Sequence, residues 1–150
     1  MNMNRHLRLI LGVAFCVLLG FTACKKKKPV SERIAKAWVA QSVKHDATEV
    51  YVVGGSNNAV PGYSNYLLIL DANKTATLEE FDNTSYTGEW ELSGETTLIL
   101  KNLGPEPPTG SNGRLEFTIK TLDDDKLVLS RLSPSLKTGN TVNEYTLKLR

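Results

Sequence analysis

Few residues of this sequence could support catalysis. His45 is the one histidine after residue 23, and it stands beside Asp46 in a short polar stretch between two predicted strands. Such a pair can be part of a catalytic triad, but a solvated turn is the simpler explanation. The chain contains no Gly-x-Ser-x-Gly nucleophile motif and no phosphate-binding glycine loop.

The acidic residues show no arrangement that requires catalysis or metal binding. Glycoside hydrolysis needs two carboxylates that face one cleft, and Glu79, Glu80, Glu89 and Glu91 are available. Strand alternation, however, places Glu89 and Glu91 on the solvent face. Residues 123–125 are all aspartate, but they lack the glycine and the closing glutamate of an EF-hand loop. The sequence therefore predicts no enzyme, no bound metal and no cofactor.

The N-terminal segment is typical of an export signal. Arg5 and Arg8 precede an apolar run over residues 9–21, and small residues lead to Cys24. The run is too short for a membrane-spanning helix, which needs about 20 apolar residues. Its end resembles the signal of bacterial lipoproteins, with Phe21 where leucine is usual.

The lipoprotein resemblance implies a cut before Cys24 and acyl chains on the sulfur and the amine of that residue. Several chains together anchor a protein stably in a membrane. We therefore expect a signal peptide at 1–23, a lipidated cysteine and basic tether at 24–30, and one domain at 31–150. The only other cysteine, Cys16, lies in the part that would be removed.

Charge is unevenly distributed along the chain. The net charge is +2, from 18 basic and 16 acidic residues. Residues 1–23 hold two arginines and Lys25–Lys28 hold four lysines, so the remaining domain has 12 basic residues against 16 acidic ones. A mildly acidic domain lacks the basic surface of a nucleic-acid-binding protein. We expect membrane contact through the acyl chains and no nucleic-acid partner.

The basic tether also bears on location. A run of like charges stays extended and can touch anionic lipid head groups. Surface-exported lipoproteins of Bacteroidetes-type bacteria resemble one another in having acidic residues after the cysteine, whereas Lys25–Lys28 are basic. We therefore expect an outer-membrane lipoprotein that faces the periplasm.

The rest of the chain reads as short strands separated by turns. The hairpin over residues 86–100 is the clearest, because Tyr86, Trp90 and Leu92 share one face and Gly94 supplies the turn. A helical turn capped by Ser31 precedes nine predicted strands. These strands are 37–44, 48–53, 66–70, 75–81, 86–92, 96–102, 114–121, 126–132 and 142–149. Regular short strands without a long helix predict an all-β, small antiparallel up-and-down barrel of about eight to nine strands.

Alternation also predicts which residues point inward. In the first strand, Trp38, Ala40 and Ser42 share one face, and the last strand places Tyr145, Leu147 and Leu149 inward. The long connections follow the second, sixth and eighth strands, so an up-and-down order gathers them at one end. The same order places the start of the first strand, and hence the tether, at that loop-bearing end.

Several segments resemble the lipocalin-like lipoproteins of Bacteroidetes-type bacteria. These are the pattern Tyr-x-Gly-x-Trp-x-Leu-Ser-Gly over residues 86–94, the apolar strand 98–100, the turn and strand 70–77, and residues 34–38, where Lys36 replaces the usual glycine. The resemblance implies a lipocalin-like barrel over most of residues 31–150. Fold alone does not fix function.

The predicted interior carries the candidate ligand site. The candidate lining residues are aromatic: Trp38, Tyr63, Tyr66, Tyr86, Trp90, Phe117 and Tyr145. A small barrel either fills its interior with side chains or leaves a hollow for one ligand. One hypothesis is a small hydrophobic ligand or lipid held at the loop-bearing end. The alternative is a filled barrel whose loops contact or inhibit another envelope protein.

Overall fold

The structure is a computed structural model, and it describes residues 27–150. The predicted signal peptide 1–23 and Cys24 lie outside the described residues. The elements in chain order are α2 (Val30–Ile34), β1 (Ala37–His45), β2 (Thr48–Val52), the 3-10 helix η1 (Pro61–Asn65), β3 (Leu67–Leu70), β4 (Thr75–Glu79), β5 (Ser85–Ser93), β6 (Thr97–Gly104), β7 (Leu115–Leu122), β8 (Lys126–Arg131), the 3-10 helix η2 (Leu136–Thr138) and β9 (Asn143–Leu149). In this part of the chain, no helix is both long and apolar enough to cross a membrane.

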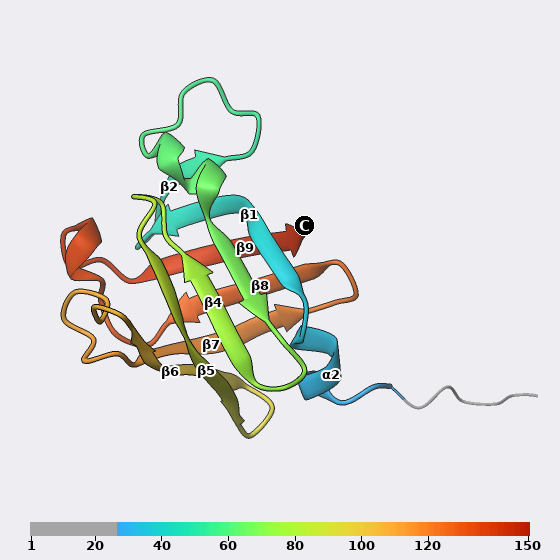
Figure 1. The fold of residues 1–150 in the computed structure, drawn as a ribbon. Helices are drawn as coiled ribbons and strands as arrows, with labels where there is room; N and C mark the ends of the chain where they lie inside the picture. Colours follow the sequence, from blue (N-terminus) through green and yellow to red (C-terminus); the bar gives the residue numbers. More distant parts are fainter. Residues whose placement is uncertain (1–26) are drawn as a thin grey trace, which may run out of the picture.

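The nine strands confirm the predicted all-β fold. Strands β1 and β3 to β9 form a closed antiparallel barrel of eight strands, and β2 is an extra strand beside it (Figure 1). The barrel closes where β9 pairs with β1, from Trp38 opposite Leu149 to His45 opposite Asn143. Closure removes the exposed strand edges that would otherwise pair with other chains.

The extra strand results from competition for one edge of β1. Residues 37–39 of β1 pair with β3, and residues 42–45 of the same strand pair with β2. Strand β2 therefore runs back beside β1 without entering the barrel order. The chain then crosses through residues 53–66, which include η1, before β3 begins.

The long connections lie together, as predicted. Segments 53–66, 80–84, 105–114 and 132–142 are at one end of the barrel, called here the loop end. The short turns 71–74, 94–96 and 123–125 are at the opposite end, called here the turn end. Figure 1 shows α2 at the turn end, across the barrel from η2.

The predicted position of the tether is wrong. Strand β1 starts at the turn end, because it pairs directly with β3 and the β1–β2 hairpin turns at the loop end. The prediction counted β2 as a barrel strand, which reversed the direction of the first strand. Residues 27–29 and α2 therefore lie at the turn end, away from the long loops.

Three local predictions are also corrected. The β1–β9 register shifts between Ala40 and Ser42, and beyond this bulge Val43 is fully buried while Ser42 is only half-buried. Leu149 is 38% exposed at the end of β9, so it does not belong to the core. Helix α2 begins after Pro29 without a side-chain cap, so Ser31 is not its cap.

The core consists of side chains that point inward by alternation. Trp38 and Trp90 occupy the turn end, where their indole N–H groups donate to the carbonyl oxygens of Ile34 (2.9 Å) and Asp71 (2.8 Å). Leucines fill the middle of the barrel, and Leu68, Leu98 and Leu127 are fully buried. Burial of each such side chain stabilises the fold by roughly 1.5–3 kcal/mol.

Helix η1 presses against the loop end and leaves no room at Gly62. A Cβ atom added there would overlap the carbonyl oxygen of Phe81, which belongs to the backbone and cannot rotate away. We expect Gly62→Ala to lower the free energy of unfolding by about 1–3 kcal/mol, because η1 would have to move. Gly104→Ala is the control, since a Cβ atom at Gly104 meets open space. Urea unfolding measures both, and equal stability of the two variants would contradict this packing.

Candidate functional site

The seven aromatic candidates separate into two groups. Trp38 and Trp90 are at the turn end and are bonded to backbone carbonyls, so they close that end. The other five lie in the loop-end half of the barrel: Tyr63, Tyr66, Tyr86, Phe117 and Tyr145. The sequence grouped all seven as one lining set, and the structure brings together only these five.

Four of the five form a packed aromatic layer inside the loop end. The rings of Tyr66 and Tyr145 stack with centroids 4.9 Å apart. Tyr63, carried by η1, lies 6.2 Å from both of these rings, and Phe117 lies 6.2 Å from Tyr145. Each of the four is at most 4% exposed. They therefore fill this part of the barrel, and Tyr63 and Tyr66 do not line an open mouth.

Two hollows lie beside the barrel of the described residues, outside the packed rings of Tyr63, Phe117 and Tyr145. One of about 590 Å³ lies at the turn end, between α2 and the strand ends near Glu95 and Ile119. Another of about 250 Å³ lies beside Val39 and Leu67 on the outer side of β1 and β3. The second hollow is lined in part by Tyr66, and neither hollow is lined by Tyr63 or Tyr145. The interior between residues 27 and 150 is thus largely occupied by side chains.

Buried polar groups share the loop end with the aromatic layer. The buried polar residues are Glu80 (6% exposed), Arg131 (8%), Ser135 (4%) and Asn143 (1%). Glu80 follows the inward residues Ala76 and Leu78 in alternation, just beyond the end of β4. Arg131 likewise follows two inward leucines of β8. A strict period of two therefore identifies both positions in the sequence, although their roles were not predicted.

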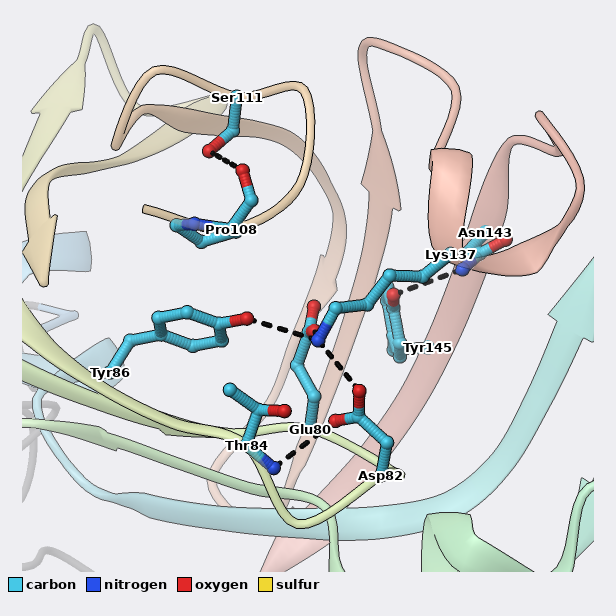
Figure 2. A network of polar contacts seen from close by, with 9 residues as sticks. All are labelled: Glu80, Asp82, Thr84, Tyr86, Pro108, Ser111, Lys137, Asn143 and Tyr145. Carbon is cyan, nitrogen blue, oxygen red and sulfur yellow. Dashed lines mark hydrogen bonds and ion pairs between the residues drawn. The ribbon is translucent and has the colours of Figure 1, made fainter. Parts of the chain in front are cut away.

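Lys137 joins the two sides of the loop end, as Figure 2 shows. Its ammonium nitrogen lies 2.6 Å from Glu80 Oε2 and 2.8 Å from Asp82 Oδ2, and it donates to the Tyr86 hydroxyl at 3.0 Å. The approach to Glu80 is too bent for a hydrogen bond, so this contact is purely ionic. Lys137 belongs to η2, between β8 and β9, while its partners flank the β4–β5 connection. The contacts form a clasp across the loop end.

The clasp keeps its members charged. Burial lowers the pKa of Lys137, but its close contacts with the oxygens of Asp82, Glu80 and Tyr86 outweigh burial and raise the pKa above its ordinary value. Burial raises the pKa of Asp82, but hydrogen bonds from Lys137 and Thr84 outweigh it and lower the pKa. Both groups are therefore ionised at neutral pH.

The His45–Asp46 pair has structural partners. His45 Nε2 lies 2.8 Å from the Tyr63 hydroxyl, and Asp46 Oδ1 accepts a hydrogen bond from the Val142 amide. Burial lowers the pKa of His45, against the opposing charge of Asp46. The pair thus positions η1 and the start of β9.

The remaining acidic candidates lie outside the loop-end cluster. Glu91 and Glu89 on the outer face approach Lys101 at 2.6 Å and 3.8 Å. In the β7–β8 turn, the backbone carbonyl of Asp124 accepts a hydrogen bond from the side chain of Lys36. Within residues 27–150, no three histidine, cysteine, aspartate or glutamate side chains come together in a way that could hold a metal ion.

Similarity of this chain to known proteins is found in its fold. No protein-family model matches the chain, and no curated protein matches it either. A lipocalin-like protein from Bacteroides uniformis ATCC 8492 superposes with a TM-score of 0.53 at 14% identity, over 79% of this chain and 99% of that chain. The fold is lipocalin-like.

A second solved structure gives a weaker likeness. It is an uncharacterized protein from Bacteroides eggerthii DSM 20697, with a TM-score of 0.49 at 11% identity over 77% of this chain and 98% of that chain. At 14% identity, the likeness to the Bacteroides uniformis protein shows the fold alone. A lipocalin-like barrel is a fold suited to binding a small ligand.

The clasp yields a stability prediction. Lys137→Met removes the cation beside Glu80 and leaves a buried carboxylate without a counter-ion. We expect a loss of about 2–3 kcal/mol in the free energy of unfolding. Lys120→Met is the control, because the half-exposed Lys120 also lies 2.6 Å from a carboxylate, that of Glu144. An exposed pair of this kind contributes less than about 1 kcal/mol. Equal losses in urea unfolding would show that the clasp is not a buried ion pair.

Proposed function

We propose that this protein is a membrane-anchored lipoprotein of lipocalin type that binds a small ligand at the loop end of its barrel. The main support for this proposal is that buried polar and charged side chains are concentrated at that end. The turn-end half of the same interior is apolar, apart from two indole N–H groups bonded to the backbone.

The buried charges support a binding role because they are unfavourable for folding alone. Transferring an ion from water to a protein interior costs several kcal/mol, and well-packed apolar side chains can replace buried ion pairs without loss of stability. Glu80 and Arg131 occupy inward positions that leucine fills elsewhere on the same strands. Binding sites combine apolar walls with a few placed polar groups, and the loop end has this composition.

The aromatic layer limits how deeply a ligand can enter. Tyr66, Tyr145 and Phe117 occupy the interior below the loops, so the ligand would lie above or among these rings. A small hydrophobic or amphiphilic molecule, such as a lipid, would then contact aromatic surface on one side and the loops on the other. Two exposed leucines of the β8–β9 connection, Leu132 and Leu136, add apolar surface at this end.

The anchor would hold the opposite end of the barrel. Cys24 is the proposed lipidation site, and residues 27–29 enter the fold at the turn end. Acyl chains on Cys24 would therefore keep the turn end near the membrane and direct the loops away from it. We propose that the anchor lies in the outer membrane and that the loops face the periplasm.

A second function is favoured by the filled interior. A barrel that holds no molecule can still present its loops to another envelope protein, as a binding or inhibitory surface. The packed aromatic layer supports this alternative. It requires no small ligand, and the next measurement separates the two.

The proposed ligand predicts a co-purified molecule. The domain from Lys25 to Arg150, isolated from a bacterial periplasm, should show an added mass in native mass spectrometry. The same mass should be present in an organic extract. Lys137→Met should reduce the occupancy, because it leaves the Glu80 carboxylate unpaired and thereby destabilises the loop end. A bare protein mass in repeated preparations, also after soaking with fatty acids, would favour the protein-binding alternative.

If Cys24 is lipidated, membrane association and acylation should both depend on this one cysteine. Cys24→Ala should move the protein from the membrane fraction to the soluble fraction and abolish labelling with a palmitate analogue. Cys16→Ala is the matched control and should leave both readouts unchanged. Membrane retention and labelling of the Cys24→Ala variant would contradict lipidation at this residue.

A further inference from the structure

Arg131 holds a positive charge inside the barrel. It is the last residue of β8 and stands opposite Phe117 of β7 in the strand register. It follows the inward residues Leu127 and Leu129 in alternation and is 8% exposed. The residue as a whole is therefore largely buried at the loop end.

This buried charge has no acidic partner. Among the described residues, no carboxylate oxygen lies within 4.0 Å of the Arg131 side chain. The hydrogen bond of its guanidinium group runs from Nε to the Ser133 carbonyl oxygen at 3.2 Å. Glu80 is the buried acid of the same layer, but Lys137 lies 2.6 Å from it and neutralises it. Arginine has five N–H donors and stays protonated, so donors and charge remain available.

Tyrosines of the aromatic layer lie in the same half of the barrel: Arg131 is opposite Phe117 in the strand register, and the Phe117 ring lies 6.2 Å from that of Tyr145. Burial raises the pKa of Tyr63, Tyr66 and Tyr145, and in each case the nearby charge of Arg131 acts in the opposite direction. The three hydroxyls therefore keep their protons and lie within electrostatic range of Arg131. Asn143 contributes an amide that donates to the Tyr145 hydroxyl at 3.2 Å. A neutral tyrosine hydroxyl can donate as well as accept, so these hydroxyls could donate to an anion near Arg131.

We propose that Arg131 is the receptor for an anionic group, a carboxylate or a phosphate, of the ligand that binds at the loop end. The guanidinium fork binds such groups through two parallel hydrogen bonds, and tyrosine hydroxyls can complete the set of donors. A buried cation without a counter-ion is unfavourable, and an anionic ligand would supply the missing charge. This inference rests on the proposed ligand-binding function and adds the chemical class of the ligand.

Access to Arg131 involves the segment that follows it. Residues 132–142 lead from Arg131 through η2 to β9, and Lys137 ties this segment to Glu80 and Asp82. An incoming anion also attracts Lys137, so it competes with these two carboxylates. The ligand would thereby loosen the clasp as it binds Arg131.

Three probes with one chain length test the assignment: decanoate, decyl phosphate and decanol. Titration calorimetry uses the whole protein carrying Cys24→Ala, so that no acyl anchor competes. We expect saturable binding of decanoate or decyl phosphate, and at least tenfold weaker binding of decanol. The two anions distinguish a fatty-acid type of ligand from a phosphate head group.

Substitutions of Arg131 test whether this residue causes the preference for anionic probes over decanol. Arg131→Gln should abolish the preference for the anions over decanol, and Arg131→Lys should retain part of it. Arg114→Gln is the control, because Arg114 is exposed and paired with Glu116, and it should bind like the parent protein. Equal affinity for decanol and the anions would overturn the anion assignment and leave ligand binding intact. No saturable binding of either anion would also overturn it, and a bare protein mass in the preceding spectrometry would then remove the ligand proposal as well.

A stability measurement separates a binding role from a structural one. In ligand-free protein, Arg131→Met removes an unpaired buried charge and should raise Tm by roughly 3 °C. A residue that serves the fold would show the opposite change. A lower Tm in Arg131→Met, with anion affinity unchanged in Arg131→Gln, would assign Arg131 to the fold and overturn the proposal.

Discussion

The shared edge of β1 determines how the rest of the barrel is arranged. One edge of this strand pairs with β9 and closes the barrel, while β3 and β2 divide the other edge between them. Because β3 pairs with residues 37–39 of β1, β2 can pair only with residues 42–45 of β1. Strand β2 therefore stays outside the barrel order. Every later strand then alternates in direction from β3 onward. The long connections consequently meet at one end, and the N-terminal helix lies at the other.

This arrangement separates stabilising and polar parts of the interior. The turn end is sealed by Trp38 and Trp90, whose polar N–H groups are satisfied by backbone carbonyls, so it contributes burial without unpaired groups. The loop end carries a glutamate, an arginine and an asparagine in buried positions. Loops that fold over these charges gain the ion pairs of Lys137. The stable half thus holds the strands in place while the other half accommodates groups that oppose folding.

Most of the fold follows from local sequence patterns. All nine strands are present within a few residues of their predicted bounds, because each has alternating apolar residues and a turn signal at its end. Local patterns could not predict that β2 lies outside the barrel. Its sequence is that of an ordinary strand, and only the competition with β3 for the edge of β1 excludes it from the barrel. The bulge near Gln41 likewise depends on pairing with β9, and it moves Val43 to the inner face.

Only some of the loop-end residues could be predicted from the sequence, because alternation applies to strands and not to connections. Alternation identifies Tyr86, Phe117 and Tyr145 as inward, and the same rule extended by two residues identifies Glu80 and Arg131. Alternation does not decide Tyr66, because residues 67–70 are apolar on both faces. Lys137 has no such signal, because it lies in a 3-10 helix whose partners are more than 50 residues away in the chain. Tyr63 lies in a long connection without a strand pattern, yet η1 inserts it into the aromatic layer, which local patterns do not encode.

The ionisation of the clasp bears on how the loop end could open. Lys137 has a raised pKa, so its contribution to stability is lost only as the pH rises through that value, above the ordinary lysine range. Asp82 has a lowered pKa, so its contribution is lost only as the pH falls through that value, below the ordinary aspartate range. Across the pH range between these limits Lys137 and Asp82 both stay charged, so protonation does not release this ion pair. A pH change near neutrality therefore does not open the loop end by removing either of these two charges.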